Sequence, residues 1–186
     1  MAEPSRRPAT YEDLKAVPPH LVAEIIFGSL ETHPRPAPRH AAASNSLSHE
    51  LTGPFQKGRG GPGGWIFLVE PELHLGPNVV VPDLAAWRRE RMPEMPHAPF
   101  FTLAPDWVTE VLSPSTAALD RADKAPIYAN ERASHLWLVD PLARTLEILR
   151  LDGATYRVVA VHKDDAKVRA EPFDAIELDL AILWAR

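Results

Sequence analysis

Two strongly apolar segments of this chain each contain an acidic residue. Val79-Val80-Val81-Pro82-Asp83 ends on an acid, and the segment from Asp106 to Leu112 encloses Glu110 among apolar residues. Short runs that are rich in β-branched and aromatic residues predict buried strands. A carboxylate in such a strand is costly unless a cation or a hydrogen bond compensates it. The fold must therefore supply a positive partner to these two acids.

A lysine that follows the acids is the natural candidate for that partner. Lys124 lies in the segment 120–132, which is predicted to be a helix. Period-two alternation gives Asp83 and Glu110 each a defined face of a strand, and the two carboxylates converge if the strands are neighbours. A helix that packs back on these strands can aim the Lys124 ammonium at the same point. The three residues together suggest a divalent metal site with a catalytic ammonium.

The composition limits the class of protein. The chain has 186 residues, which favours one domain over residues 1–186, with residues 1–9 expected to be flexible. It has no cysteine, so disulfides and thiolate metal sites are excluded. The net charge of −5 argues against a general polyanion binder. The first residues lack an apolar signal-peptide core and no stretch reaches about 18 apolar residues, so no membrane association and a cytoplasmic location are expected.

Short apolar segments alternate with a few helical ones along the chain. This order predicts an α/β or α+β fold with a mixed central sheet flanked by helices, preceded by an N-terminal helix and a hairpin. Expected helices begin after Thr10, at about Arg39 and at Asp120; expected strands cover 21–27, 30–32, 65–69, 72–75, 79–87, 106–112, 135–140, 145–151 and 155–162.

The order of these segments resembles the Uma family of restriction-endonuclease-like proteins in the PD-(D/E)xK nuclease superfamily. The resemblance spans about residues 10 to 180, nearly the whole chain. No single piece is specific, but the order of all of them together is. It rests on the early segment 23–30, the helix near His40, Val81-Pro82-Asp83, the segment Pro105 to Thr116, the segment Asp120 to Tyr128, and His135 to Pro141.

This resemblance implies a function and a set of site residues. It implies Mg²⁺- or Mn²⁺-dependent hydrolysis of phosphodiester bonds in DNA, by a protein that is expected to form a homodimer. The implied catalytic residues are Asp83, Glu110 and Lys124; the implied metal ligands are Asp83, Glu110 and the backbone carbonyl of Val111; the implied accessory residues are Glu24, His40 and Tyr128.

One position departs from the pattern of the superfamily. Its usual lysine lies two residues after the second acid, where this chain has Leu112. The Uma type resembles a variant in which the lysine has moved to the following helix, which gives Lys124. Such a lysine works only if its ammonium reaches the same point in space.

Each of these residues also has a purely structural interpretation. Asp83 can end a strand as a turn residue, Lys124 can be a solvated helix residue, and Tyr128 can be a core residue. Glu24 can lie on the solvent face of an edge hairpin. Glu110 is hardest to explain in this way, because it stands in mid-strand.

Other motifs are weaker. Arg88, Arg89 and Arg91 follow the first acidic strand and are candidates for phosphate contact near the carboxylates, with a solvated loop as the alternative. The glycine-rich segment 58–64 precedes a strand and lacks the P-loop pattern, so it predicts a flexible turn. The histidines lack zinc-ligand spacing, and the segment 113–116 lacks a nucleophile elbow. All five tryptophans fall in or beside predicted strands and are expected in the core or an interface.

Two further functions stay open at this point. A non-catalytic protein with a nuclease fold that binds nucleic acid or a protein partner is suggested by the net negative charge and by Leu112. A structural or assembly protein that uses its apolar strands as an interface would show no response to metal.

Overall fold

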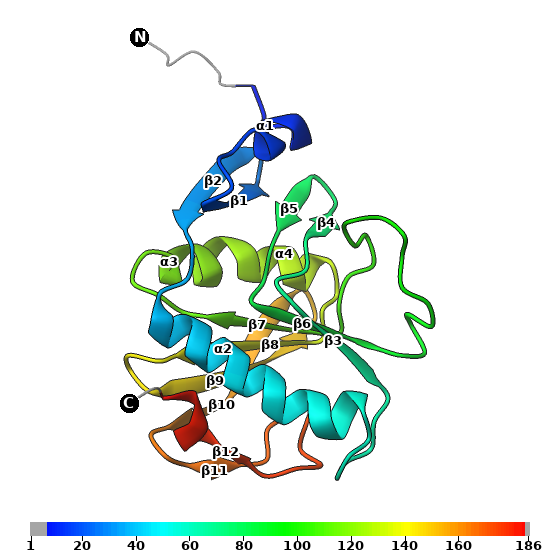
Figure 1. Ribbon diagram of the computed structural model, residues 1–186, viewed down its shortest axis with the longest axis vertical. Coiled ribbons are helices and arrows are strands. Elements are labelled where there is room, and N and C mark those ends of the chain that lie inside the picture. The colour runs from blue at the N-terminus through cyan, green and yellow to red at the C-terminus, as the bar shows by residue number, and fades with distance from the viewer. Residues whose placement is uncertain (1–6, 185–186) are drawn as a thin grey trace.

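The computed structural model describes residues 7–184, and Figure 1 shows the arrangement of its elements. Helix α1 (Tyr11–Lys15) begins at Thr10, whose side chain accepts from the Asp13 amide while the Asp13 carboxylate accepts from the Thr10 amide. This capping box satisfies two amides that the first helical turn leaves free. The predicted helix start is therefore confirmed. Residues 1–6 of the segment that was expected to be flexible lie outside the described residues.

The predicted hairpin follows α1. Strands β1 (Leu21–Ile26) and β2 (Ser29–Pro34) pair antiparallel around Phe27 and Gly28, whose φ angles are 49° and 83°. Two consecutive positive φ angles match the hairpin turn whose twist suits antiparallel strands. The Ala9 amide donates to the Gly28 carbonyl at 2.8 Å, which ties the start of the described chain to the turn.

A six-stranded mixed sheet forms the centre of the molecule. Its order is β10-β9-β8-β7-β6-β3, with β7 and β8 parallel and the other neighbours antiparallel. The mixed sheet predicted from the sequence is confirmed. Its strands are β3 (Trp65–Val69), β6 (Leu84–Arg88), β7 (Trp107–Val111), β8 (His135–Asp140), β9 (Thr145–Asp152) and β10 (Thr155–Lys163).

A smaller sheet joins the hairpin to the middle of the chain. Its order is β2-β1-β5-β4, where β4 is Leu73–Leu75 and β5 is Asn78–Val80. The single strand predicted over residues 79–87 is wrong, because it is divided between this sheet and β6 by a bend at Val81–Asp83. Pro82 lacks an amide hydrogen and cannot continue a ladder, which explains the break. Asp83 therefore lies at a corner between two sheets rather than on the face of one strand.

Two helical segments cover the central sheet. Helix α2 (Pro38–Leu51) continues into the π-helical turn η1 (Thr52–Gln56). The second segment runs from α3 (Ala117–Leu119) through the π-helical turn η2 (Asp120–Lys124) into α4 (Ala125–Asn130). Pro54 lies within η1, and Pro126 follows η2. A proline cannot make the regular helical hydrogen bond and crowds the preceding turn, so a local widening accompanies each proline.

The helices divide the apolar core into two parts. On one face of the central sheet, residues of α2 and the C-terminal segment pack against Trp107 and Trp137. On the other face, residues of α4 and the smaller sheet pack against Val108 and Leu138. Figure 1 shows α2 and α4 on opposite sides of the sheet. All five tryptophans are buried, as predicted.

The C-terminal part closes the α2 side with β11 (Lys167–Val168), β12 (Leu178–Asp179) and the 3₁₀ helix η3 (Leu180–Leu183). Within residues 7–184, no helix combines the length and the apolar character that crossing a membrane requires.

Candidate active site

Asp83 is fixed at the corner between the two sheets by hydrogen bonds to both carboxylate oxygens. Oδ2 accepts from the Val111 amide at 2.7 Å, and Oδ1 lies 2.5 Å from Nε2 of His40 in the first turn of α2. Its own carbonyl accepts from the Glu70 amide at 3.0 Å. Asp83 therefore lies directly beside the end of β7, next in space to the residue that follows Glu110.

Glu110 is buried in the middle of β7 on the side of α4. Its Oε1 is 2.8 Å from the Lys124 ammonium and accepts from the Tyr128 hydroxyl at 2.5 Å. Both partners come from the helical segment that follows β7, with Lys124 at the end of the π-helical turn and Tyr128 one turn later. The helical segment after β7 therefore brings the Lys124 ammonium to Glu110, and its role at a centre shared with Asp83 stays a prediction.

Lys124 has two further carboxylate partners. Its Nζ lies 3.1 Å from Oε1 of Glu24 in β1 and 3.5 Å from Oδ1 of Asp120, four residues earlier in the chain. The Lys124 side chain is only 3% exposed, so the interpretation of a solvated lysine is wrong. We refer to Glu24, Glu110, Asp120, Lys124 and Tyr128 as the carboxylate–lysine cluster.

The charges of the carboxylate–lysine cluster do not balance. Three carboxylates share one ammonium, so full ionisation leaves two negative charges uncompensated in a buried place. Burial raises the pKa of Glu110 well above its usual value, although Lys124 opposes this rise. Burial lowers the pKa of Lys124, but the fields of Glu110 and Glu24 outweigh that effect and hold it well above its usual value. The cluster thus has a strong demand for further positive charge.

Glu24 has one satisfied and one unsatisfied oxygen. Oε1 accepts from the Val81 amide at 2.7 Å, whereas Oε2 is buried and has no hydrogen-bond partner among residues 7–184. Nε2 of His33 on the adjacent strand β2 lies 3.5 Å from Oε2. Glu24 is fully buried, so its interpretation as a solvent-facing hairpin residue is wrong. A buried oxygen without a partner is a natural place for a ligand.

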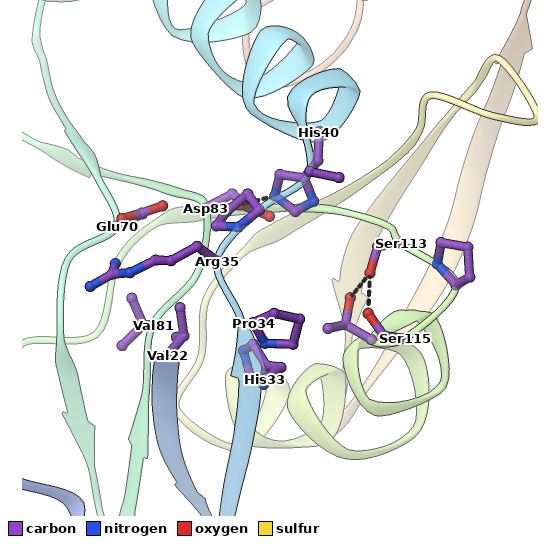
Figure 2. Close-up of a pocket in the computed structure, with 14 residues that line it drawn as sticks. Val22, His33, Pro34, Arg35, His40, Glu70, Val81, Asp83, Ser113 and Ser115 are labelled. Atoms are coloured by element: carbon purple, nitrogen blue, oxygen red, sulfur yellow. Dashed lines mark hydrogen bonds and ion pairs between the residues drawn. The ribbon is translucent and has the colours of Figure 1, made fainter. Parts of the chain in front are cut away.

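A cleft of about 260 Å³ opens beside Asp83. Figure 2 shows Asp83 with His40 at the upper centre of the view, Arg35 to the left, His33 below, and Ser113 with Ser115 to the right. The Asp83 and His40 side chains are 12% and 13% exposed. The cleft therefore gives solvent access to Asp83, and it borders the buried carboxylate–lysine cluster through Asp83 and His33.

The three arginines proposed as phosphate contacts are not beside the carboxylates. Arg88 ends β6, whereas Asp83 precedes the first residue of that strand, and five strand residues span about 16 Å. Arg91 forms an ion pair with Asp106 at 2.8 Å, and Arg88 stacks over Trp65 at 4.4 Å from the ring centroid. Arg89 reaches the Trp65 carbonyl at 3.5 Å. The expectation that these arginines lie near the carboxylates is wrong, because β6 runs away from the site.

Two residues of the site were not identified from the sequence. Asp120 was counted only as a helix start, although its spacing of four residues from Lys124 is the spacing of helical ion pairs. The spacing of the histidines in the sequence gives no signal for His33. Its place beside Glu24 follows from the hairpin register, which pairs Glu24 with Glu31 and thus puts His33 on the same face of the sheet. For Val111 the structure shows the amide in contact with Asp83, and its carbonyl as a metal ligand stays a prediction.

The donor set has the chemistry that a hard divalent cation requires. Asp83, Glu110 and Glu24 offer carboxylate oxygens, and one oxygen of Glu24 is unsatisfied. In the part of the chain that the structure describes, no three His, Cys, Asp or Glu residues are already arranged around a common ion position. Mg²⁺ commonly binds through one or two carboxylates and keeps several waters, so it does not need a complete protein cage. These residues fit a Mg²⁺ or Mn²⁺ ion with a partly aqueous shell.

Comparisons with known proteins agree with the fold and order of these elements. Residues 8–182 match the Uma2 family, which is described as "Putative restriction endonuclease". A crystal structure from Anabaena variabilis, of "a putative nuclease belonging to DUF820", superposes with a TM-score of 0.76 over 95% of this chain and 98% of that chain, at 22% sequence identity. The superposition confirms the predicted fold class. None of the curated proteins matches this sequence.

Proposed function

The chain belongs to the Uma2 family, and on that premise we propose that it is a Mg²⁺-dependent endonuclease, with Mn²⁺ as an effective substitute, that hydrolyses phosphodiester bonds of DNA. One observation carries this proposal: three buried carboxylates share a single ammonium beside a cleft that exposes Asp83. Two uncompensated negative charges are the charge that one divalent cation neutralises. A catalytic metal gives a reason for a cluster that would otherwise cost stability.

Side chains at this site can be assigned as ligands of the proposed Mg²⁺ ion. Asp83 and Glu110 are the ligands in this proposal, the carbonyl of Val111 is a third candidate, and Glu24 is an accessory acid near the metal. When bound, the ion polarises a phosphoryl oxygen and lowers the pKa of its water.

The other side chains of the site orient the proposed metal ligands and the reacting groups. Tyr128 donates to Glu110 and thereby fixes the orientation of its carboxylate. His40 and the Val111 amide hold the two oxygens of Asp83, so its position is set before substrate arrives. Lys124 would orient the attacking water or stabilise the charge that develops on the phosphoryl group, because its ammonium contacts Glu110 directly.

A cleavage assay tests this proposal. Purified protein is incubated with supercoiled plasmid and with circular single-stranded DNA, in Mg²⁺, Mn²⁺ or EDTA. We expect cleavage only with metal, and we expect Asp83→Asn and Glu110→Gln to lower its rate by at least about 100-fold, since each removes a metal ligand. Glu50→Gln is the matched control, because Glu50 is exposed on α2. Cleavage that survives both site substitutions would refute the assignment.

A second function has a specific observation in its favour. Lys124 and Glu110 are each about 3% exposed, and both oxygens of Asp83 already have protein partners. A protein that keeps this fold without catalysis, and binds nucleic acid or another protein, would use Lys124 only as a counter-charge. Calorimetry with Mn²⁺ separates the two functions. Binding that Asp83→Asn abolishes supports the enzyme, and no binding supports the non-catalytic protein.

A further inference from the structure

The cleft beside Asp83 is small in relation to paired DNA. Its volume of about 260 Å³ corresponds to roughly nine water molecules at about 30 Å³ each. This is room for one nucleotide unit and not for two paired strands. The reacting groups lie behind it, since Asp83 is only 12% exposed and Glu110 about 3%. A phosphate must therefore enter the cleft to reach them.

The walls of the cleft are stiff. One wall is the segment 34–37, which begins at the last residue of β2 and contains Pro34 and Pro36, and the lining also includes Pro114 between Ser113 and Ser115. Figure 2 shows Pro34 and the two serines on different sides of the cleft. Proline fixes φ near −65° and removes one backbone freedom at each of these positions. The Ser113 hydroxyl also forms hydrogen bonds with the hydroxyls of Ser115 and Thr116, each at 3.0 Å. These bonds connect the residues of that wall to one another. Such walls resist the widening that a duplex would require.

The charge around the cleft is also small in relation to a duplex. Double-stranded DNA has one negative charge per roughly 1.7 Å of axis, and its binding proteins neutralise several phosphates with Lys and Arg. Among the side chains that line this cleft, Arg35 is the one lysine or arginine; His33 and His40 lie beside it, and Glu70 and Asp83 are carboxylates of the same lining. Arg88, Arg89 and Arg91 lie at the other end of β6. The cleft thus offers a cation for one phosphate at most.

The surface of the cleft suits an unpaired nucleotide. Val22, Val81 and the proline rings give it apolar walls, and His33 and Arg35 add a ring and a planar guanidinium. Unstacked bases pack on histidine rings and on guanidinium planes, whereas paired bases have no free face to offer. The hydroxyl groups of Ser113 and Ser115 add hydrogen-bonding capacity at the opposite wall.

We infer that the cleft receives one unpaired nucleotide of single-stranded DNA, with its base or sugar against His33 and Arg35 and its phosphate at Asp83. The substrate of the centre is then a single strand, or an unpaired segment of a duplex. The chemistry at Asp83 rests on the proposed function, whereas the preference for an unpaired strand rests on the cleft alone.

Fluorescence anisotropy tests the preference without any chemistry. The full-length protein in EDTA is titrated into a labelled single-stranded oligonucleotide and into the same oligonucleotide annealed to its complement, at one salt concentration. Stacking of one base contributes about 1–3 kcal/mol, so we expect the single strand to bind at least about fivefold more tightly. Equal or tighter binding of the duplex, or no binding of the single strand, would overturn the inference.

Substitutions locate the binding to the cleft. His33→Ala and Arg35→Ala are expected to weaken single-strand binding at least about fivefold, by the same stacking argument. Arg35→Lys keeps the positive charge but loses the planar guanidinium group. Its affinity for the single strand is therefore expected to lie between that of Arg35→Ala and that of the unmodified protein. Arg59→Ala is the matched control, because Arg59 is exposed beyond the far end of α2, and the helix from His40 to Leu51 alone spans about 16 Å. Single-strand affinity that stays unchanged in both alanine variants would overturn the inference, and thermal unfolding verifies that each variant is folded.

Cleavage of the same two oligonucleotides separates this inference from the proposed function. Preferential binding of the single strand without cleavage of either DNA in Mg²⁺ or Mn²⁺ would refute the endonuclease and leave the binding preference. Cleavage of the duplex at the same rate as the single strand would leave the endonuclease and refute the preference. We expect metal-dependent cleavage that is faster for the single strand.

Discussion

The two faces of the central sheet are built on opposite principles. The face toward α2 holds a cluster of aromatic rings in which Phe173 contacts Phe55, Trp65 and Trp107 at centroid distances of 4.7–5.1 Å. The face toward α4 holds the carboxylate–lysine cluster inside an otherwise apolar layer. A single strand serves both, because alternation in β7 sends Trp107 to the first face and Glu110 to the second.

This difference indicates that the aromatic face contributes stability, whereas the charged face is the place of the proposed chemistry. Aromatic rings in contact stabilise the first face by burial and by their mutual geometry. Buried charges on the second face cost desolvation, and replacing them with apolar residues of similar volume is often neutral or stabilising in other proteins. The cluster has a clear role only if its charge is used in chemistry. The following predictions compare the two faces, from the largest expected effect to the smallest.

Removing the one ammonium of the second face has the largest expected effect on stability. Lys124→Met leaves three buried carboxylates without their counter-charge, and we expect a loss of about 4–5 kcal/mol in the free energy of unfolding. Adding Glu110→Gln to Lys124→Met is expected to restore part of this loss, since it removes one of those charges. Urea unfolding measures both, with the exposed Lys163→Met as control. A double variant that is less stable than Lys124→Met would contradict the charge argument.

Truncating the centre of the first face comes next. Phe173→Ala removes a ring that is 1% exposed and contacts several others, so we expect a loss of about 3–4 kcal/mol. Phe27→Ala, at a ring that is 59% exposed, is expected to change stability little. Chemical denaturation gives both values. The folded Phe173→Ala protein should keep the proposed metal-dependent activity of the unmodified protein, and a selective loss of that activity in a fully folded variant would show that the faces are not independent.

Metal should stabilise the protein through the second face only. A ligand present at 100 times its Kd stabilises the folded state by about 2.7 kcal/mol, and we expect Mn²⁺ to raise the melting temperature accordingly. Asp83→Asn should abolish the shift, whereas Phe173→Leu should keep it. Differential scanning calorimetry with and without Mn²⁺ checks this. An equal shift in Asp83→Asn would mean that the ion binds elsewhere.

The smallest expected effect is a pH dependence of the free energy of unfolding, which His135 causes at the edge of the aromatic face. Burial lowers the pKa of His135 below its usual 6.5, with Arg150 and Arg88 acting in the same direction and Glu171 opposing them. The stability that this neutral imidazole contributes is present above about pH 6.5 and is lost as the pH falls through the lower pKa of the folded state. His135→Gln should therefore lose less stability between pH 7.5 and pH 5.5 than the unmodified protein, in urea unfolding at both values. His49→Gln, at an exposed site on α2, should behave as the unmodified protein does.

Local patterns in the sequence predict much of this fold. The capping signal at Thr10, the hairpin around Gly28 and the apolar segments of β3, β7 and β8 each express a rule that acts over a few residues. The buried acid in β7 was also visible in this way, because a carboxylate in mid-strand needs a partner. Family resemblance supplied the order of the elements and the choice of Lys124.

The rest of the site depends on contacts between distant segments. The bend at Pro82 assigns Val79 and Leu84 to different sheets, and period-two alternation does not reveal such a break. The sequence predicts a regular helix from Asp120, whereas Lys124 ends a π-helical turn, and Pro126 alone does not specify that geometry. His33 meets Glu24 only through hairpin register and burial. Such features are set by the packing of the whole molecule.

Diffraction from crystals soaked in Mn²⁺ tests the central claim most directly, because anomalous scattering locates the ion without reference to activity. The account predicts one site at which carboxylate oxygens of Asp83 and Glu110 both lie within about 2.6 Å of the ion. A well-occupied ion elsewhere, or an empty site beside Asp83 at saturating Mn²⁺, would contradict it.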